Sequence, residues 1–380
     1  MDLWSFIMSK HNYLTHEQLL SALSLRDLTN PKHGMHAMQQ LISEAETAVA
    51  ALWSCYLQRI NANPIVPVYE NYDALGYPVD GASRDIRYSR YVSDSLMLRT
   101  QTSSSVPTWL SSWRSLRPES LGIISHGLVY RRDCIDRWHC AEPHQLDIWI
   151  VMPKAQAEDT QILSDSISAL MKTLLPNHVV QQSKSPHPYT INGVQLDAIE
   201  GQNLIEVGEC GNIDPDLLTR NGWSSDDYTG VAIGLGLDRV LMLRKGIPDI
   251  RLLRDPDPRI QQQMLDLSPW RPVSRQPKAE RDISIVVNRD TDMDIIGDQV
   301  RLTLGEQAHW LEELQLLSRT EYQQLPKSAI ERLGMTSTQV NLLLRINLRH
   351  PTRSVPTSLA NELRNKIYLS LNQGHNYLAN

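Results

Sequence analysis

The spacing of apolar positions separates helical stretches of the chain from strand-like stretches. From Met35 to Ile60 apolar residues recur at intervals of three and four, which predicts one long amphipathic helix. Thr15 and Gln18 have the spacing of a capping box, which predicts that a shorter helix begins after Thr15. After Asn61 short alternating runs are separated by Gly, Pro, Asn and Asp, a pattern typical of antiparallel strands and loops.

Two strands are predicted on either side of a polar loop in the middle of the chain. The segments LGIISHGLVYRR and HQLDIWIVM read as strands, and the stretch from Asp133 to Pro143 reads as the loop. Because side chains alternate between the faces of a strand, Gln145, Asp147 and Trp149 are expected on one face.

A hairpin and a strand–helix unit are predicted next. VQLDAIEGQNLIEVG indicates a hairpin that turns near Gly201 and carries Glu206 on its second arm. GVAIGLGLDRVLMLRKG indicates an apolar, glycine-rich strand that passes into a helix ending at Gly246.

The last hundred residues read as a separate α+β unit. Three prolines between Ser268 and Lys278 are typical of a linker. A strand (RDISIVV), a second strand (QVNLLLRINLR) and a helix (SLANELRNKIYLSLNQG) follow, which favours a ferredoxin-like sandwich. The expected organisation is a helical segment 1–60, a main domain 61–268, a linker 269–277 and a C-terminal domain 278–380.

Composition excludes several classes of protein. With 41% hydrophobic and 21% charged residues in 380, the chain is neither disordered nor fibrous. No apolar run is long enough to span a bilayer and the start resembles no signal peptide, so we expect a cytoplasmic protein without membrane contact. Four scattered cysteines are expected to be reduced thiols.

Charge gives a local rather than a global indication of partners. The net charge of −6 does not favour nucleic-acid binding. Residues 325–380, however, hold 7 Lys and Arg against 2 Glu, and Arg345 and Arg349 lie on the outward face of a predicted strand. This face is either an ordinary solvated surface or a surface that follows phosphates.

Certain arginines and carboxylates could form a site. Arg131 ends a strand and Arg239 begins a helix after glycine-rich backbone, positions that suit polyphosphate, although each could form an ordinary ion pair. Asp147 and Glu206, with Gln145, could hold an ammonium group. A cleft with both features suits a zwitterionic amino acid beside ATP.

Four segments resemble class II aminoacyl-tRNA synthetases, and within them phenylalanyl-tRNA synthetases, especially the single-chain organellar form. LMLRTQTSS resembles that family's LLRTHTS. VYRRDCIDRWHCAEPHQLD resembles its motif 2, VYRRD followed by FHQLE. LIEVGECG is similar to WLEVLGCG, and GVAIGLGLDRVLMLRKGIPDIR is similar to motif 3, GFAFGLGLERLAM followed by GIPDIR. The resemblance implies a class II antiparallel sheet flanked by helices and a C-terminal anticodon-binding domain.

The resemblance also implies roles for individual residues. Arg131 and Arg239 would be catalytic. ATP, with Mg²⁺ as cofactor, would be bound by Arg131, Asp133, His139 and Arg239. The amino acid would be bound by Gln101, Ser103, Gln145, Asp147 and Glu206, and its side-chain pocket would include His187, Tyr189, Val231 and Ile233. Arg345 and Arg349 would contact RNA.

The chain departs from the family in the expected amino-acid pocket. The family's Phe-Pro-Phe is His187-Pro188-Tyr189 here, and the Phe-Ala-Phe of motif 3 is Val231-Ala232-Ile233. Gln101 replaces a histidine, and Ile148 replaces a small residue. Each lost aromatic pair removes roughly 0.5–1.5 kcal/mol of ring contacts. Either other aromatic residues refill the space or the chain takes a different amino acid.

The leading hypothesis is ATP-dependent activation of an amino acid and its transfer to tRNA. The alternatives are a related enzyme that serves a non-tRNA acceptor and a non-catalytic RNA-binding module. A zinc site at Cys134, His139, Cys140 and His144 does not fit a standard zinc spacing, so no metal site is expected. The oligomeric state stays open between monomer and homodimer.

Overall fold

The computed structural model describes residues 13–86, 88–116, 118–156, 158–273, 276–350 and 352–375. The chain forms two compact units. The first takes in the described parts of residues 1–131, 142–247 and 263–270, and the second those of 132–141, 248–262 and 271–380. The predicted domain bounds remain a prediction, and parts of the segments 1–60, 269–277 and 278–380 lie outside the described residues.

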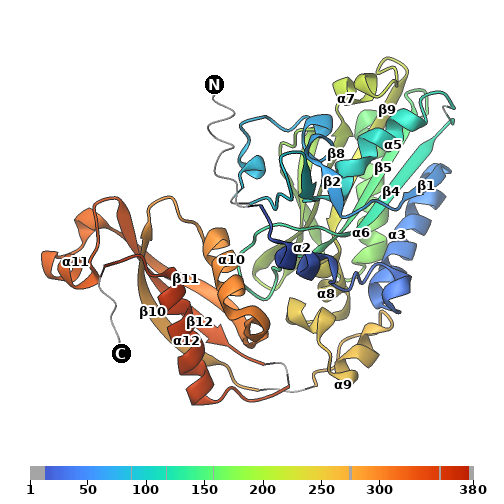
Figure 1. The fold of residues 1–380 in the computed structure, drawn as a ribbon. Coiled ribbons are helices and arrows are strands. Elements are labelled where there is room, and N and C mark those ends of the chain that lie inside the picture. The colour runs from blue at the N-terminus through green and yellow to red at the C-terminus, as the bar shows by residue number, and fades with distance from the viewer. Residues whose placement is uncertain are drawn as a thin grey trace, which may run out of the picture. The chain divides into compact units, whose positions relative to one another are not determined.

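A seven-stranded sheet forms the first unit (Figure 1). Its order is β1-β4-β5-β9-β8-β7-β6, and every neighbouring pair is antiparallel except β1 with β4. The strands are β1 (Tyr56–Ile60), β4 (Leu121–Leu128), β5 (His144–Pro153), β6 (Val180–Lys184), β7 (Thr190–Glu200), β8 (Asn203–Ile213) and β9 (Tyr228–Gly236). The sequence predicts an antiparallel sheet, and this is wrong at the edge strand, because β1 runs parallel to β4 and makes the sheet mixed.

Helices pack against one face of this sheet. They are α3 (Ala37–Trp53), α6 (Asp159–Leu174) and α8 (Leu237–Lys245). The predicted helix over 35–60 is wrong at its C-terminal end. Ser54 has a left-handed backbone conformation that ends α3, and residues 56–60 pair with β4 as β1. Strand pairing therefore overrides a helical spacing that continues to Tyr56.

Other local predictions are confirmed. Thr15 caps α2 (His16–Leu23) through a complete capping box with Gln18. The hairpin β7–β8 turns at Gly201, whose φ of 62° favours glycine. Strand β9 runs directly into α8, and Gly246 ends that helix in the left-handed conformation.

Shorter elements complete the described chain. The remaining strands and helices of the first unit are β2 (Ile65–Pro67), β3 (Leu96–Leu98), α4 (Val68–Asn71), α5 (Val106–Ser112) and α7 (Pro215–Arg220). The 3-10 helices are η1 (Pro31–His33), η2 (Asp73–Leu75), η3 (Ala82–Arg84), η4 (Thr102–Ser105), η5 (Ile250–Arg254), η6 (Gln262–Met264), η7 (Gly305–Trp310) and η8 (Tyr322–Gln324).

The second unit contains a three-stranded antiparallel sheet in the order β10-β12-β11. Its elements are α9 (Pro258–Gln261), β10 (Ala279–Asn288), α10 (Met293–Leu304), β11 (Leu311–Glu321), α11 (Lys327–Leu333), β12 (Gln339–Leu348) and α12 (Thr357–Leu371). The alternate β12 residues that the sequence predicts to be inward are buried: Val340, Leu342, Leu344, Ile346 and Leu348. The ferredoxin-like assignment stays a prediction, because a fourth strand does not follow α12 among the described residues.

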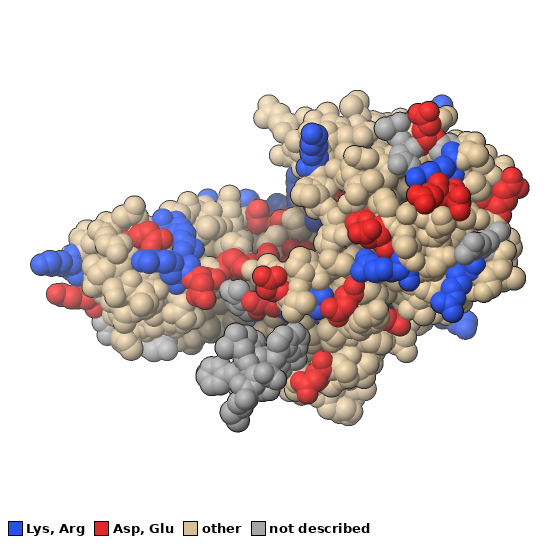
Figure 2. Space-filling view, turned by 90° about the horizontal axis from the view of Figure 1, so that it is seen from above, with Lys and Arg blue, Asp and Glu red and all other residues tan. Residues whose placement is uncertain are grey.

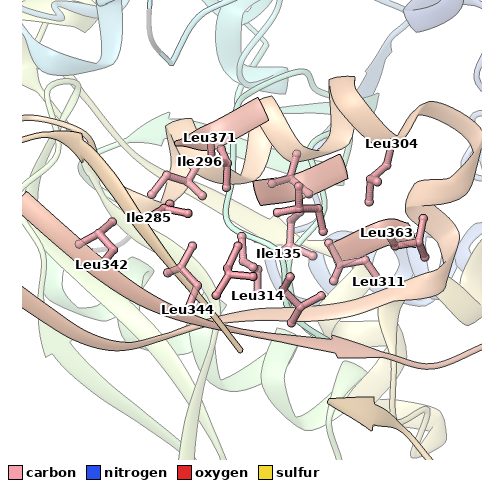
Figure 3. Close-up of a cluster of buried hydrophobic side chains, with 14 of the residues drawn as sticks. Ile135, Ile285, Ile296, Leu304, Leu311, Leu314, Leu342, Leu344, Leu363 and Leu371 are labelled. Carbon is pink, nitrogen blue, oxygen red and sulfur yellow. The ribbon is translucent and has the colours of Figure 1, made fainter. Parts of the chain in front are cut away.

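The polar loop 132–141 belongs to this second unit. Ile135 lies in its hydrophobic core beside Leu314 and Leu344 (Figure 3). Arg301 of α10 donates hydrogen bonds to the backbone carbonyls of Asp133 and Cys134. The loop therefore has a buried apolar anchor and bonded carbonyls.

None of the described helices is long and apolar enough to span a membrane.

A buried polar network joins the start of β5 to α8 in the first unit. The Asp238 carboxylate accepts hydrogen bonds from the backbone N–H and from Nδ1 of His144, and both side chains are buried. The His144 Nε2 accepts from the backbone N–H of Leu28 at 3.0 Å. The histidine is therefore held as the Nδ1–H tautomer, and its position fixes the end of the sheet where β5 begins.

This network predicts a stability defect for Asp238→Asn. The Asn amide has one acceptor oxygen where the carboxylate has two, so one buried donor of His144 loses its hydrogen bond. This should lower the free energy of unfolding by roughly 1–3 kcal/mol. Urea unfolding measures the change, with Asp216→Asn at the exposed start of α7 as the control. An Asp238→Asn protein within ~0.5 kcal/mol of wild type would contradict this role.

Candidate functional site

Two carboxylates and a glycine form a row on the sheet face of the first unit that does not carry α6 and α8. Asp147 of β5 lies directly opposite Gly234 of β9, and Gly234 lies opposite Glu209 of β8. Directly opposed residues of antiparallel strands project to the same face. A Cβ on Gly234 would lie 3.6 Å from Asp147 Oδ1, so the glycine leaves space between the two acidic side chains.

Polar groups from η4 surround Asp147. Its carboxylate accepts a hydrogen bond from Thr102 Oγ1, and the Thr102 backbone N–H donates to Gln145 Oε1 at 3.3 Å. Ser103 Oγ lies 3.3 Å from the hydroxyl of Tyr189. The described structure therefore brings Ser103, Gln145, Asp147 and Tyr189 together, four of the residues that the sequence predicts for amino-acid binding.

Gln101 joins the same cluster through Tyr77. The Tyr77 hydroxyl donates to Gln101 Oε1 at 2.7 Å, and Gln101 Nε2 donates to the backbone carbonyl of Asn71 at 2.8 Å. The Tyr77 hydroxyl also lies 3.4 Å from His187 Nε2. Tyr77 and Asn71 were not predicted from the sequence, because no motif around residues 71–77 points to them.

Aromatic rings form the wall beside this row. The Tyr189 ring stacks on Trp149 with centroids 5.2 Å apart and meets the His187 ring edge-on at 4.1 Å. Tyr77 contacts His187 edge-on at 5.8 Å. Trp149, His187 and Tyr189 therefore supply aromatic surface beside the Asp147 row, and the choice between refilling and a different amino acid stays open.

Burial changes the ionisation of two groups. Removal from water raises the pKa of Asp147 to about 6, although the hydrogen bond from Thr102 acts in the opposite direction and lowers it. Burial lowers the pKa of His187 to about 4, so this imidazole is neutral at pH 7. A nearby cation stabilises the ionised form of such a buried carboxylate, as expected for a group that binds ammonium.

The strand register corrects the expectation for Val231 and Ile233. Ile233 pairs with Ile148, and Val231 pairs with Ile150, so both point to the face away from Asp147. Ala232, which pairs with Trp149, lies on the site face instead and belongs to the same hydrophobic cluster as Tyr189. The two aliphatic residues are therefore core residues on the opposite face, and Ala232 takes the position on the Asp147 face.

Three charged residues share one end of the sheet. The pairs Leu128–His144 and Gln145–Gly236 place the ends of β4 and β9 and the start of β5 together. Arg131 follows β4, Arg239 lies in the first turn of α8, and Glu206 lies near the start of β8.

The two arginines differ in their contacts. Arg239 Nη1 donates to the Glu206 backbone carbonyl at 3.0 Å and lies 3.6 Å from its carboxylate. Arg131 Nε is buried and has no hydrogen-bond partner among the described residues. An unpaired buried guanidinium nitrogen suits an oxygen ligand such as a phosphate.

Comparisons with known proteins decide the family. Residues 23–264 match the family described as "tRNA synthetases class II core domain (F)". The chain belongs to this family.

Two curated relatives are both phenylalanine–tRNA ligase alpha subunits. The chain is 30% identical over 251 residues to the phenylalanine–tRNA ligase alpha subunit of Prochlorococcus marinus (strain NATL2A), covering 65% of this chain and 73% of that protein. The same subunit from Caldanaerobacter subterraneus is 32% identical over 212 residues, covering 51% and 59%. A solved pyrrolysyl-tRNA synthetase from Desulfitobacterium hafniense is 18% identical, with a TM-score of 0.46, over 60% of this chain and 76% of its own.

These matches confirm the predicted class II, phenylalanyl-tRNA synthetase-like identity and its aminoacyl-tRNA ligase-like character. The single-chain organellar type stays a prediction.

Two predicted ATP contacts of this synthetase-family chain lie in the loop of the second unit. His139 Nδ1 lies 2.7 Å from Asp136 Oδ2, and Asp133 Oδ1 accepts from the Cys134 backbone N–H at 2.9 Å. Ligand atoms of Asp133, Cys134 and His139 lie within 4.8 Å of one another. Burial and nearby carboxylates raise the pKa of Cys134 to about 12, so the free thiol is protonated at pH 7.

The predicted RNA-binding arginines already have acidic partners. Arg345 donates two hydrogen bonds to Asp282, at 2.9 and 3.0 Å, and Arg349 lies 3.1 Å from Glu312. Figure 2 shows acidic and basic side chains interspersed on the face in view.

A cavity of about 730 Å³ also opens in the second unit. Its basic lining residues are Arg251, Arg254, Arg353, His309 and His350. Arg353 lies over the Trp310 ring at 5.1 Å, an arrangement that places a guanidinium and an aromatic face together.

The raised pKa of Asp147 predicts a pH-dependent difference between wild type and Asp147→Asn. The folded carboxyl holds its proton more tightly than the unfolded one, whose pKa is near 3.8. The stabilisation of the folded state by the protonated Asp147 carboxyl is therefore fully present below about pH 4 and is lost as the pH rises through 6. The free energy of unfolding, measured in urea, should rise in Asp147→Asn by roughly 1–3 kcal/mol relative to wild type between pH 4 and pH 8.

Asp197→Asn, at a second buried carboxyl of the same sheet, is the control for this comparison. Parallel pH profiles for wild type and Asp147→Asn would show that the Asp147 carboxyl is not buried in the folded protein.

Proposed function

We propose that this chain activates an amino acid with ATP and transfers it to tRNA. The observation that carries the proposal is the buried Asp147 carboxylate of β5 together with Arg131 after β4 and Arg239 in α8, at one end of the same sheet, in a chain of the class II synthetase family. A cation site and two phosphate-binding guanidinium groups together suit a zwitterionic substrate beside a nucleoside triphosphate.

In the proposed first step, an oxygen of the amino-acid carboxylate attacks the α-phosphorus of ATP. The bond to the bridging oxygen breaks, and pyrophosphate leaves with the electron pair. Arg131 would stabilise the charge that develops on the α-phosphoryl oxygens, since its buried Nε has no hydrogen-bond partner in the described part of the chain. Arg239 would hold the outer phosphates, whose charge Mg²⁺ would screen.

Asp147, Gln101, Gln145 and Ser103 would orient the substrate through its α-ammonium group. No protein nucleophile is needed, because positioning and electrostatic stabilisation supply the rate enhancement. In the second step a ribose hydroxyl of tRNA attacks the acyl carbonyl carbon, and AMP leaves. The ATP contacts of Asp133 and His139 remain part of the proposal.

Replacement of Arg239 tests the nucleotide half of the proposal. Arg239→Ala should lower amino-acid-dependent exchange of pyrophosphate into ATP by roughly 100-fold or more, because one phosphate-binding group is lost. Arg220→Ala, on the exposed α7, is the control and should keep wild-type exchange. Near wild-type exchange in Arg239→Ala would refute the assignment.

The second unit is proposed to bind the acceptor tRNA as an anticodon-binding domain of ferredoxin-like type. Support comes from Arg345 on β12 and Arg349 just after it. The cavity around Arg254 and Arg353, which Asp255 and Asp257 also line, adds further guanidinium groups. A phosphate would have to compete with the Asp282 and Glu312 carboxylates for the first two arginines, so we expect moderate affinity that depends on salt.

Charge reversal tests this RNA contact. Arg345→Glu with Arg349→Glu should weaken tRNA binding and lower the slope of log K against log salt concentration by roughly one to two. The control pair, Arg364→Glu with Lys366→Glu on α12, makes the same change in net charge. If both double variants weaken tRNA binding equally, net charge alone governs binding and this strand has no special role.

A further inference from the structure

Glu209 is a half-buried acidic side chain, 39% exposed, beside Asp147 on the same sheet face, and the motif comparison did not predict it. The family segment WLEVLGCG has glycine where this chain has Glu209. The strand register places it on the same face as Asp147, two strands away, with Gly234 between them. The row therefore carries a second carboxylate beyond the one proposed for the α-ammonium group.

The contacts of Glu209 leave room for a further partner. Its Oε1 accepts one hydrogen bond, from Ser185 Oγ at 2.7 Å, and its Oε2 lies 3.8 Å from His187 Nε2. A carboxylate can accept about four hydrogen bonds. Within the described residues no Lys or Arg pairs with it, and the His187 ring is neutral at pH 7 because burial lowers its pKa to about 4.

Other polar atoms of the pocket also lack partners within the chain. The Nδ1 of His187 and the Oγ1 of Thr190 are buried and form no hydrogen bond among the described residues. Buried polar atoms that stay unpaired are costly, so a bound molecule that supplies partners is favoured. The rings of Tyr77 and Tyr189 line the same space, and aromatic faces beside a carboxylate attract donors and cations.

We propose that Glu209 is a specificity-determining residue and that the activated amino acid has a side chain ending in a hydrogen-bond donor. An amine and a phenol share this chemistry. The inference rests on the proposed function and deepens it, since it names the substrate class of the same pocket. A plain hydrocarbon side chain would leave the Glu209 carboxylate without a donor from the substrate.

Matched substrate pairs test the proposal. L-Lysine and L-norleucine differ in the terminal ammonium, and L-tyrosine and L-phenylalanine differ in one hydroxyl. Pyrophosphate exchange should give a kcat/KM for the donor-bearing member of at least one pair that is about 100-fold or more above its partner. Glu209→Gly should reduce that ratio by about tenfold or more.

Glu209→Gln distinguishes a phenol donor from an ammonium donor. Its amide oxygen still accepts from a phenol but carries no charge to attract a cation, so it should spare tyrosine and impair lysine. Glu200→Gln, the same change on the exposed end of β7, is the control and should leave both ratios unchanged.

The outcomes separate this inference from the proposed function. Equal exchange with both members of each pair, unchanged in Glu209→Gly, overturns the role of Glu209 and keeps the function. If exchange fails with these four and with every other standard amino acid, the proposed function fails. Thermal shift with the same four amino acids then decides the inference: stabilisation by a donor-bearing member alone, lost in Glu209→Gly, supports it, and equal shifts overturn it.

Discussion

The arrangement of the site depends on one buried carboxylate, that of Asp147. The seven-stranded sheet places it beside a glycine and under the hydroxyl of Thr102, where water has little access. An ionised group in such a position is costly unless a cation arrives. The same burial that raises its pKa thus makes it a strong partner for an ammonium group, so stability and binding compete at this residue.

The rest of the first unit serves to hold this arrangement. The buried pair of His144 and Asp238 fixes the start of β5 against α8, next to Gln145 and three residues from Asp147. The stacked rings of Trp149 and Tyr189 fill the neighbouring position. Because these contacts come from separate strands and loops, the pocket requires the complete sheet rather than any single motif.

Much of the fold was predictable because its signals are local. The capping box at Thr15, the turn at Gly201 and the alternation in β12 all depend on neighbours in the sequence. The end of α3 was missed because the pairing of residues 56–60 with β4 is a long-range contact.

The candidate site was predictable only in part, for the same reason. Motifs indicated Gln145 and Asp147, but the face of Val231 and Ile233 depends on the register between β5 and β9. Tyr77 joins the site through packing that leaves no mark on the local sequence. Glu209 stands out in the motif comparison, but its place beside Asp147 depends on the pairing of β8 with β9.

The ionisation of Asp147 in the free protein is the most direct test of this account. Carbon-13 NMR of protein labelled at the aspartate carboxyl carbons, with Asp147→Asn to assign the signal, gives its titration curve. The account predicts a midpoint near pH 6. A midpoint near the ordinary value of 3.8 would contradict it, because the carboxylate would then be solvated and would have no need of a substrate cation.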